Sequence, residues 1–346
     1  MKVILDVMGG DLAPEAAVLG ALEAHREFGT DITLVGRGEE ILQVLGKHNI
    51  KDLPEGLEIA NAEDVVDMHD DPTSIIHKRK NSSMVIGLKM LADGQADAFI
   101  SAGNTGALLT GATLLVRRVK GVRRGAFCPL IPNKAGGRTL IIDCGANVEC
   151  SAEFLLQFGI IGSVYAKKSM GISNPKVGLL NNGTEDSKGT PLQKEAYGLL
   201  MQAKEAGVVN FVGNVEARDV PLGAVDVVVC DGFAGNILLK SIEGTAQFLG
   251  SAMKKMFTKN WKSKLGYLLC KSGADEIKSM MDYREVGGTE ILGIRKPVIK
   301  AHGSSDARAF RSAIRQAENA AKLNTAQELE AALQQISALK EQVSHD

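Results

Sequence analysis

The stretch KVGLLNNGTEDSKGT (176–190) joins an apolar run to a dense group of polar residues, and it decides how the fold is interpreted. Its first four residues after Lys176 are apolar or glycine without alternation, which is typical of a strand buried on both faces of a parallel sheet. A solvated turn needs only one or two hydrogen-bonding side chains, yet almost every residue from Asn181 onward carries one. The pattern predicts a strand that ends at a site for a highly charged small molecule.

The same pattern recurs along the chain, with short apolar runs that end in Gly, Asn or Asp. The runs are 2–11, 31–38, 56–62, 96–106, 138–148, 208–216 and 225–236. Helix-like segments lie between most of them, at 12–29, 73–93, 151–169 and 190–206. This alternation predicts an α/β fold, a three-layer α/β/α sandwich with a largely parallel sheet.

Composition excludes several classes of protein. The 346 residues carry a net charge of -1 and only 4% aromatic residues, so we expect no nucleic-acid partner. The five cysteines form no CxxC pair, so neither a zinc site nor any other metal site is expected. The chain begins on a strand pattern without a signal peptide, and no apolar stretch reaches the ~18 residues of a membrane span. We therefore expect a cytoplasmic protein.

Ligands of open α/β sheets bind at the C-terminal ends of the strands. Five such ends are polar or glycine-rich here: DVMGGD (6–11), SAGNTG (101–106), DCGAN (143–147), NNGTEDSKG (181–189) and DGFAGN (231–236). Any one of them could be a plain turn, but a parallel sheet gathers all five at one edge. Their backbone N–H groups suit an oxyanion such as phosphate, although no P-loop, GxGxxG, HExxH or GxSxG motif is present.

Lys188 is the candidate cation of this edge. It could stabilise phosphate or a tetrahedral oxyanion, or it could form a local ion pair with Glu185, three residues earlier. Asn236 could donate a hydrogen bond to the same group, or it could cap a helix. His302 is the one histidine set among glycine and serines, in KAHGSS (300–305).

These five motifs and KAHGSS together resemble, in order and spacing, the PlsX family of bacterial phosphate acyltransferases. The resemblance covers about residues 1–325. It implies an isocitrate/isopropylmalate-dehydrogenase-like fold, a homodimer, and transfer of a fatty acyl group from acyl carrier protein to inorganic phosphate. The acyl-phosphate product would serve a membrane glycerol-3-phosphate acyltransferase in phospholipid synthesis. No cofactor is expected.

The catalytic candidates are Lys188 and Asn236. The substrate-binding candidates lie on the six motifs and are Asp6, Gly9, Gly10, Asp11, Ser101, Gly103, Asn104, Thr105, Gly106, Asn147, Asn182, Gly183, Glu185, Ser187, Asp231, Gly232, Gly235, His302, Gly303, Ser304 and Ser305.

Three other functions stay open. A phosphotransacetylase would use short acyl-CoA in place of acyl carrier protein. An NAD-dependent decarboxylating dehydrogenase of the same fold class would need a convergent set of metal-binding aspartates, which Asp226 and Asp231 alone do not supply. A non-catalytic scaffold would bind acyl carrier protein and a membrane without turnover.

Two helical segments complete the chain. We expect one catalytic domain over 1–324, with a helical insertion at about 251–283, and a C-terminal helical tail at 325–346. In the insertion an apolar stripe runs among lysines, which is typical either of a helix at the inner face of the membrane or of a buried interface. The stripe consists of Met253, Met256, Phe257, Trp261, Leu265 and Leu268. The tail could pack on its own chain or form a partner-dependent coil.

Overall fold

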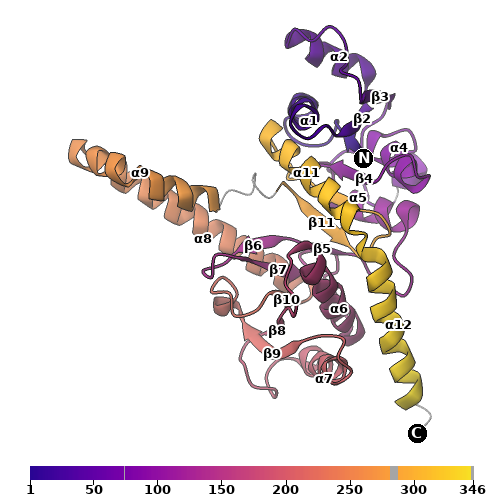
Figure 1. The fold of residues 1–346 in the computed structure, drawn as a ribbon, viewed down its shortest axis with the longest axis vertical. Coiled ribbons are helices and arrows are strands. Elements are labelled where there is room, and N and C mark those ends of the chain that lie inside the picture. Colours follow the sequence, from indigo (N-terminus) through magenta and orange to yellow (C-terminus); the bar gives the residue numbers. More distant parts are fainter. Residues whose placement is uncertain (74, 281–286, 344–346) are drawn as a thin grey trace.

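The computed structural model describes residues 1–73, 75–280 and 287–343. Its described part forms two lobes, each built around its own sheet (Figure 1). The predicted α/β class is confirmed, with helices packed on largely parallel strands. The strands belong to two sheets, whereas the sequence pattern led us to expect one.

The first lobe holds a seven-stranded sheet in the order β3-β2-β1-β4-β12-β11-β5. All neighbours are parallel except β11, which is antiparallel to both β12 and β5. The strands are β1 (Lys2–Asp6), β2 (Asp31–Gly36), β3 (Leu57–Asn61), β4 (Ala98–Ser101), β5 (Ala126–Cys128), β11 (Thr289–Leu292) and β12 (Val298–Lys300). We did not predict β5, β11 or β12, because three or four residues are too short to show a period.

Helices cover this sheet on both faces, with α1 (Glu15–Phe28) and α11 (Ala307–Leu323) on one and α4 (Ser83–Ala92) on the other. The shorter elements of the lobe are α2 (Gly38–Lys47), α3 (Ile75–Lys78), α5 (Thr105–Gly111) and η1 (Ala112–Val116). The single helix expected at 73–93 is wrong. Ser82 caps a new helix there, since its hydroxyl accepts the amide hydrogen of Val85.

The second lobe holds a five-stranded sheet in the order β6-β7-β10-β8-β9, parallel except for β6. The elements are β6 (Leu130–Pro132), β7 (Arg138–Ile142), β8 (Val177–Asn181), β9 (Phe211–Glu216), β10 (Val227–Val229), α6 (Ala152–Ser169), α7 (Pro191–Glu205) and η2 (Ala217–Asp219). Helices α6 and α7 contribute to one core of this lobe. On the other face of this sheet, Leu238 of helix α8 (Gly232–Thr258) packs with Ile141 and Val228.

The chain crosses between the sheets at Pro129, from β5 directly into β6. The amide of Phe127 on β5 donates to the carboxylate of Asp143, which follows β7, at 2.9 Å. The amide of Cys144 donates back to the Phe127 carbonyl at 3.0 Å. These bonds join the end of a second-lobe strand, β7, to the first-lobe strand β5.

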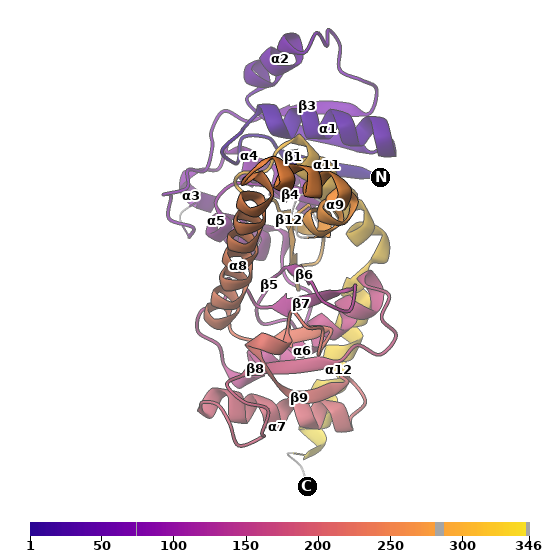
Figure 2. The ribbon, with the colours of Figure 1, turned by 90° about the vertical axis from the view of Figure 1, so that its left-hand side faces the viewer.

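Three long helices extend from this body: α8 (Gly232–Thr258), α9 (Trp261–Met280) and α12 (Thr325–Val343). Helices α8 and α9 lie side by side and project from the lobes as an arm, whereas α12 runs along the second lobe (Figures 1 and 2). The arm begins well before the predicted insertion, and residues 281–283 of that prediction and 344–346 of the predicted tail lie outside the described residues.

Candidate functional site

The six polar motifs lie at strand ends, three of them in each lobe. We call the loops 6–11, 101–106 and 300–305 of the first lobe the first rim, and the loops 143–147, 181–189 and 231–236 of the second lobe the second rim. Each loop follows a strand of a parallel set, as the topology required. Among the described residues, no three metal-binding side chains form a group that could hold a metal ion.

The first rim is tied together by a buried carboxyl. Asp6 is 2% exposed and accepts the Ser101 hydroxyl at 2.6 Å, and Ser101 in turn accepts the amide of Gly103 at 3.0 Å. Burial raises the pKa of Asp6, and the bonds from Ser101 and the Met8 amide oppose that rise. The Gly103 amide, predicted to face a ligand, is therefore engaged within the protein.

Glycine lets the backbones of this rim touch. A Cβ on Gly9 would lie 2.5 Å from the Gly103 nitrogen, so the two loops leave no room for a side chain. Gly10 adopts a φ of +103°, which L-residues rarely adopt, and the neighbouring Asp11 amide donates to the Gly303 carbonyl at 2.8 Å. Loops from β1, β4 and β12 thus form one compact surface.

Lys300, at the end of β12, is the residue of this rim that we missed. Its ammonium group donates to the carbonyls of Ala102, at 3.2 Å, and Ala301. Burial lowers the pKa of Lys300 to about 8, although Asp6 and Asp11 oppose the shift. A lysine beside a polar strand end is a usable signal, and KAHGSS contains it.

The rest of the KAHGSS loop (300–305) is held by hydrogen bonds between its own residues. The His302 ring bonds the Ser304 hydroxyl at 2.8 Å, and burial and the ammonium groups of Lys300 and Lys240 lower the pKa of His302. Lys240 belongs to α8, so the pKa of His302 depends on a charge of the arm as well as on its own rim. Ser305 is 1% exposed, and its hydroxyl has no hydrogen-bond partner within the described ranges.

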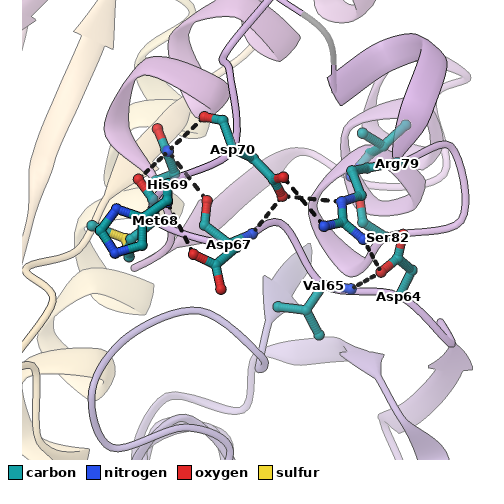
Figure 3. A network of polar contacts seen from close by, with 10 residues as sticks. Asp64, Val65, Asp67, Met68, His69, Asp70, Arg79 and Ser82 are labelled. Atoms are coloured by element: carbon teal, nitrogen blue, oxygen red, sulfur yellow. Dashed lines mark hydrogen bonds and ion pairs between the residues drawn. The ribbon is translucent and has the colours of Figure 1, made fainter.

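The side chain of Asn104 is hydrogen-bonded within the protein on both of its polar atoms. Its side-chain oxygen accepts the amide of Ala107 and caps α5, while its side-chain nitrogen reaches the carbonyls of Asp67, Met68 and Asp70. Figure 3 shows that loop, in which Arg79 bridges Asp64 and Asp70. Thr105 is exposed beside this cap, and a Cβ on Gly106 would press on Pro72.

The second rim also contains a buried carboxyl. Asp143 is fully buried, burial raises its pKa, and it accepts the backbone amide of Asn147 at 2.6 Å. The Asn147 side chain donates both to Asp143 and to the Gly125 carbonyl. Asn147 therefore shapes its loop and ties it to the first lobe.

The start of α8 packs against this loop without spare room. Gly232 donates to the Asn147 carbonyl at 2.7 Å, and a Cβ on Gly235 would overlap the Asp143 carbonyl oxygen. Asp231 caps the helix by accepting the Ala234 amide at 2.8 Å. The alternative in which Asn236 is the cap is therefore wrong; Asn236 lies inside α8 and is exposed.

The 181–189 loop of the second rim is largely exposed. The Lys188 ammonium lies 3.9 Å from Glu185, so the local ion pair is present, but both side chains are about half exposed and the pair is weak. Asn181 holds the turn through the Lys188 carbonyl, and the Glu185 carbonyl accepts the side chain of Asn214. Asn182 and Ser187 are exposed, whereas Gly183 is buried under the aliphatic part of Lys188.

The cysteines near the rims are poor nucleophiles. Burial raises the pKa of Cys144 and Cys230 well above the ordinary value and that of Cys150 to about 12. Only the thiolate attacks carbonyl carbon at a useful rate. The arrangement therefore favours binding and polarising two reactants over a covalent intermediate on cysteine.

The predicted apolar stripe divides between two helices. Asn260 caps α9 by accepting the Ser263 amide at 2.9 Å, so Met253, Met256 and Phe257 lie on α8 and the other members on α9. Trp261 is 71% exposed and Leu268 66% exposed. Within the described ranges, no helix is long and apolar enough to cross a bilayer.

The tail has the opposite character. Leu329, Leu333 and Ile336 are buried in the core of the second lobe, where α12 packs on α6. Packing on its own chain, one of the two alternatives for the tail, is confirmed for these residues.

Comparison with known proteins agrees with the sequence resemblance. The family model described as "Fatty acid synthesis protein" matches residues 1–328. A phosphate acyltransferase of Brevibacillus brevis is 47% identical over 91% of this chain and 92% of its own. One from Caldanaerobacter subterraneus is 45% identical over 92% and 93%.

Solved structures share the fold at low identity. A phosphotransacetylase from Streptococcus pyogenes has a TM-score of 0.61 and 19% identity, over 95% of this chain and 94% of its own. A branched-chain phosphotransacylase from Enterococcus faecalis has a TM-score of 0.55 and 15% identity, over 92% and 98%.

Proposed function

The chain belongs to the phosphate acyltransferase family, and we propose that the two rims are where it transfers a fatty acyl group to inorganic phosphate in phospholipid synthesis. The observation that carries this assignment is the gathering of six polar loops at the strand ends of both lobes, with a lysine on each rim. Oxyanion binding is the property that this reaction needs most, first for phosphate and then for the tetrahedral intermediate.

The proposed reaction is direct. A phosphate oxygen attacks the thioester carbonyl, the carbon–sulfur bond breaks, and the thiol leaves with acyl-phosphate as the other product. Lys188 and Asn236 would stabilise the oxyanion from the exposed side, while Lys300 adds a cation from the first rim. Holding both reactants in line supplies much of the acceleration, and the leaving thiol has an ordinary pKa near ~8.5 that needs little acid help.

We assign the remaining predicted residues to the walls of this site. The glycines Gly9 and Gly10 let their backbone approach that of Gly103 and Gly303 closely, and Ser305 offers a buried hydroxyl without a partner in the described ranges. Asp6, Asn104, Asn147 and Asp231 would act by shaping their loops, because their side chains are bonded to the protein.

The acyl donor is proposed to be acyl carrier protein. A direct test measures acyl-phosphate by trapping it with hydroxylamine, in reactions that contain phosphate and either acyl carrier protein thioester or acyl-CoA. We expect product only when phosphate is present, and faster turnover with the carrier protein. Faster turnover with short acyl-CoA would instead make the enzyme a phosphotransacetylase.

The arm is proposed to contact the inner face of the cell membrane, where a glycerol-3-phosphate acyltransferase would receive the product. Its exposed apolar side chains lie among Lys254, Lys255, Lys259, Lys262 and Lys264. Each lysine near an anionic surface adds about 1 kcal/mol, and salt screens this attraction. We therefore expect a cytoplasmic enzyme that binds anionic membranes peripherally.

A Phe257→Glu/Trp261→Glu variant tests this surface. It should lose salt-sensitive binding to anionic liposomes and keep turnover on soluble substrate. The arm is also the candidate contact of a homodimer, so sedimentation of the same variant is the control. A variant that becomes monomeric while liposome binding persists would make the stripe a dimer contact.

A further inference from the structure

A hollow of about 230 Å³ lies between the lobes and away from both rims. Helix α6 and helix α11 form its walls, and residues of β6, β7 and β11 complete it. None of the residues of the two rims lines it. The hollow is therefore separate from the proposed acyl-transfer site.

Glu290 of β11 lines this hollow and is only 7% exposed. Its carboxyl makes no hydrogen bond or ion pair with any residue in the described ranges, which is costly for a buried polar group. Burial raises the pKa of Glu290 to about 8. At neutral pH this carboxyl is mostly protonated and can donate a hydrogen bond.

Two arginines line the same hollow, Arg138 from β7 and Arg315 from α11. Neither guanidinium makes an ion pair or hydrogen bond with a residue that the structure describes. They are close enough that Arg315 adds to the burial that lowers the pKa of Arg138. Two exposed cationic side chains therefore line one hollow, and neither is paired with its carboxyl, Glu290.

We propose that the hollow binds a small oxyanion between Arg138 and Arg315, with Glu290 as a hydrogen-bond donor to it. Guanidinium groups bind phosphate and carboxylate through paired, charge-assisted hydrogen bonds. The buried hydroxyls of Tyr165 and Ser312, which also line the hollow, are neutral donors of the kind that an anion accepts. The shared chemistry fits inorganic phosphate or the head of a phosphate monoester.

The titratable groups around Glu290 make its ionisation the pH-sensitive step. Burial raises the pKa of Cys128 on β5 and of Tyr165 on α6, so both stay neutral up to about pH 9, beside the guanidinium groups of Arg138 and Arg315. Above pH 8 the Glu290 carboxylate would repel the anion. Affinity at this site should therefore fall about tenfold between pH 7 and pH 9.

Calorimetric titration with inorganic phosphate, and separately with methyl phosphate, tests the site on the full chain. Arg138→Gln/Arg315→Gln should bind one phosphate fewer per chain than the wild type, with the phosphate KM changed less than twofold. Arg26→Gln/Lys204→Gln removes the same charge from exposed positions and should bind as the wild type does. A preference for methyl phosphate would identify a monoester as the ligand.

Glu290→Gln keeps the shape and the donor, so its phosphate affinity in the hollow should fall less between pH 7 and pH 9 than that of the wild type. The proposal fails if the arginine variant keeps the wild-type stoichiometry, or if Glu290→Gln keeps the pH dependence. It also fails if the arginine variant changes only the oligomeric state, because the hollow would then hold a side chain of a second copy.

Discussion

The two rims differ in how firmly the protein holds their polar and charged side chains. On the first rim, Asp6 and Ser101 are buried and bonded to each other, and Lys300 is held on backbone carbonyls. On the second, Lys188 has only a 3.9 Å ion pair and Asn236 is exposed. The cation of the first rim is thus held by the protein, whereas Lys188 and Asn236 of the second rim are donors that a substrate can engage.

The largest effect that this comparison predicts is on turnover at the second rim. Lys188→Ala and Asn236→Ala should each lower kcat about 10²–10³-fold, which is the usual loss when one preorganised oxyanion donor is removed. Stability should change little, because both side chains are largely exposed. Initial rates of acyl-phosphate formation and thermal unfolding of the same preparations measure the two quantities.

Lys194→Ala is the matched control, since Lys194 is an exposed lysine on the neighbouring helix α7. It should keep wild-type turnover. Near-normal turnover in Lys188→Ala would return that lysine to the plain ion pair with Glu185.

The sequence predicted five of the six rim loops as strand ends, because each follows a buried run of residues, whereas the strand before the 300–305 loop was not predicted. It could not predict that the side chains of Asn104 and Asn147 would be hydrogen-bonded within the protein. Their partners, the 67–70 loop and Gly125, are distant in sequence. Lys300 was missed for a similar reason. A lysine at the end of a short strand usually faces solvent, and only the packing of three loops around Lys300 makes it half-buried.

The arm and the tail show a second limit of what the sequence can predict. Both have apolar residues at helical spacing, but α12 buries Leu329 and Leu333 against α6, whereas α9 leaves Trp261 and Leu268 exposed. Periodicity identifies an apolar face and says nothing about what covers it. The break at Asn260 was visible only as one cap residue among lysines.

The next effect is on stability, at the start of α8. Gly235→Ala should lower the free energy of unfolding by about 1–3 kcal/mol, because its Cβ would overlap the Asp143 carbonyl oxygen. Gly244→Ala on the same helix has open space and should instead add up to about 1 kcal/mol. Denaturant unfolding compares the two, and equal behaviour would mean that the second rim is not tightly packed.

A pH profile sharpens the comparison further. Lys300 loses its charge as the pH rises through about 8, so the phosphate KM should rise about tenfold by pH 9. Lys300→Arg keeps the charge at every pH and should flatten the profile, whereas Lys300→Met should show the high KM throughout. A wild-type profile that stays flat would leave Lys300 with the structural task of holding the Ala102 and Ala301 carbonyls.

The smallest effect concerns Gly103, at the centre of the first rim. A Cβ there would lie 2.9 Å from the terminal methyl of Met84 and 3.3 Å from the Ser101 hydroxyl, so it points into the protein. Because Met84 ends in a flexible group that can move, Gly103→Ala should cost only about 1 kcal/mol. Adding Met84→Val should recover part of that loss, which unfolding of the single and double variants would measure as a coupling. If stability is unchanged but the phosphate KM rises several-fold, the loop contacts the ligand directly, and the first rim is less fixed than its hydrogen bonds indicate.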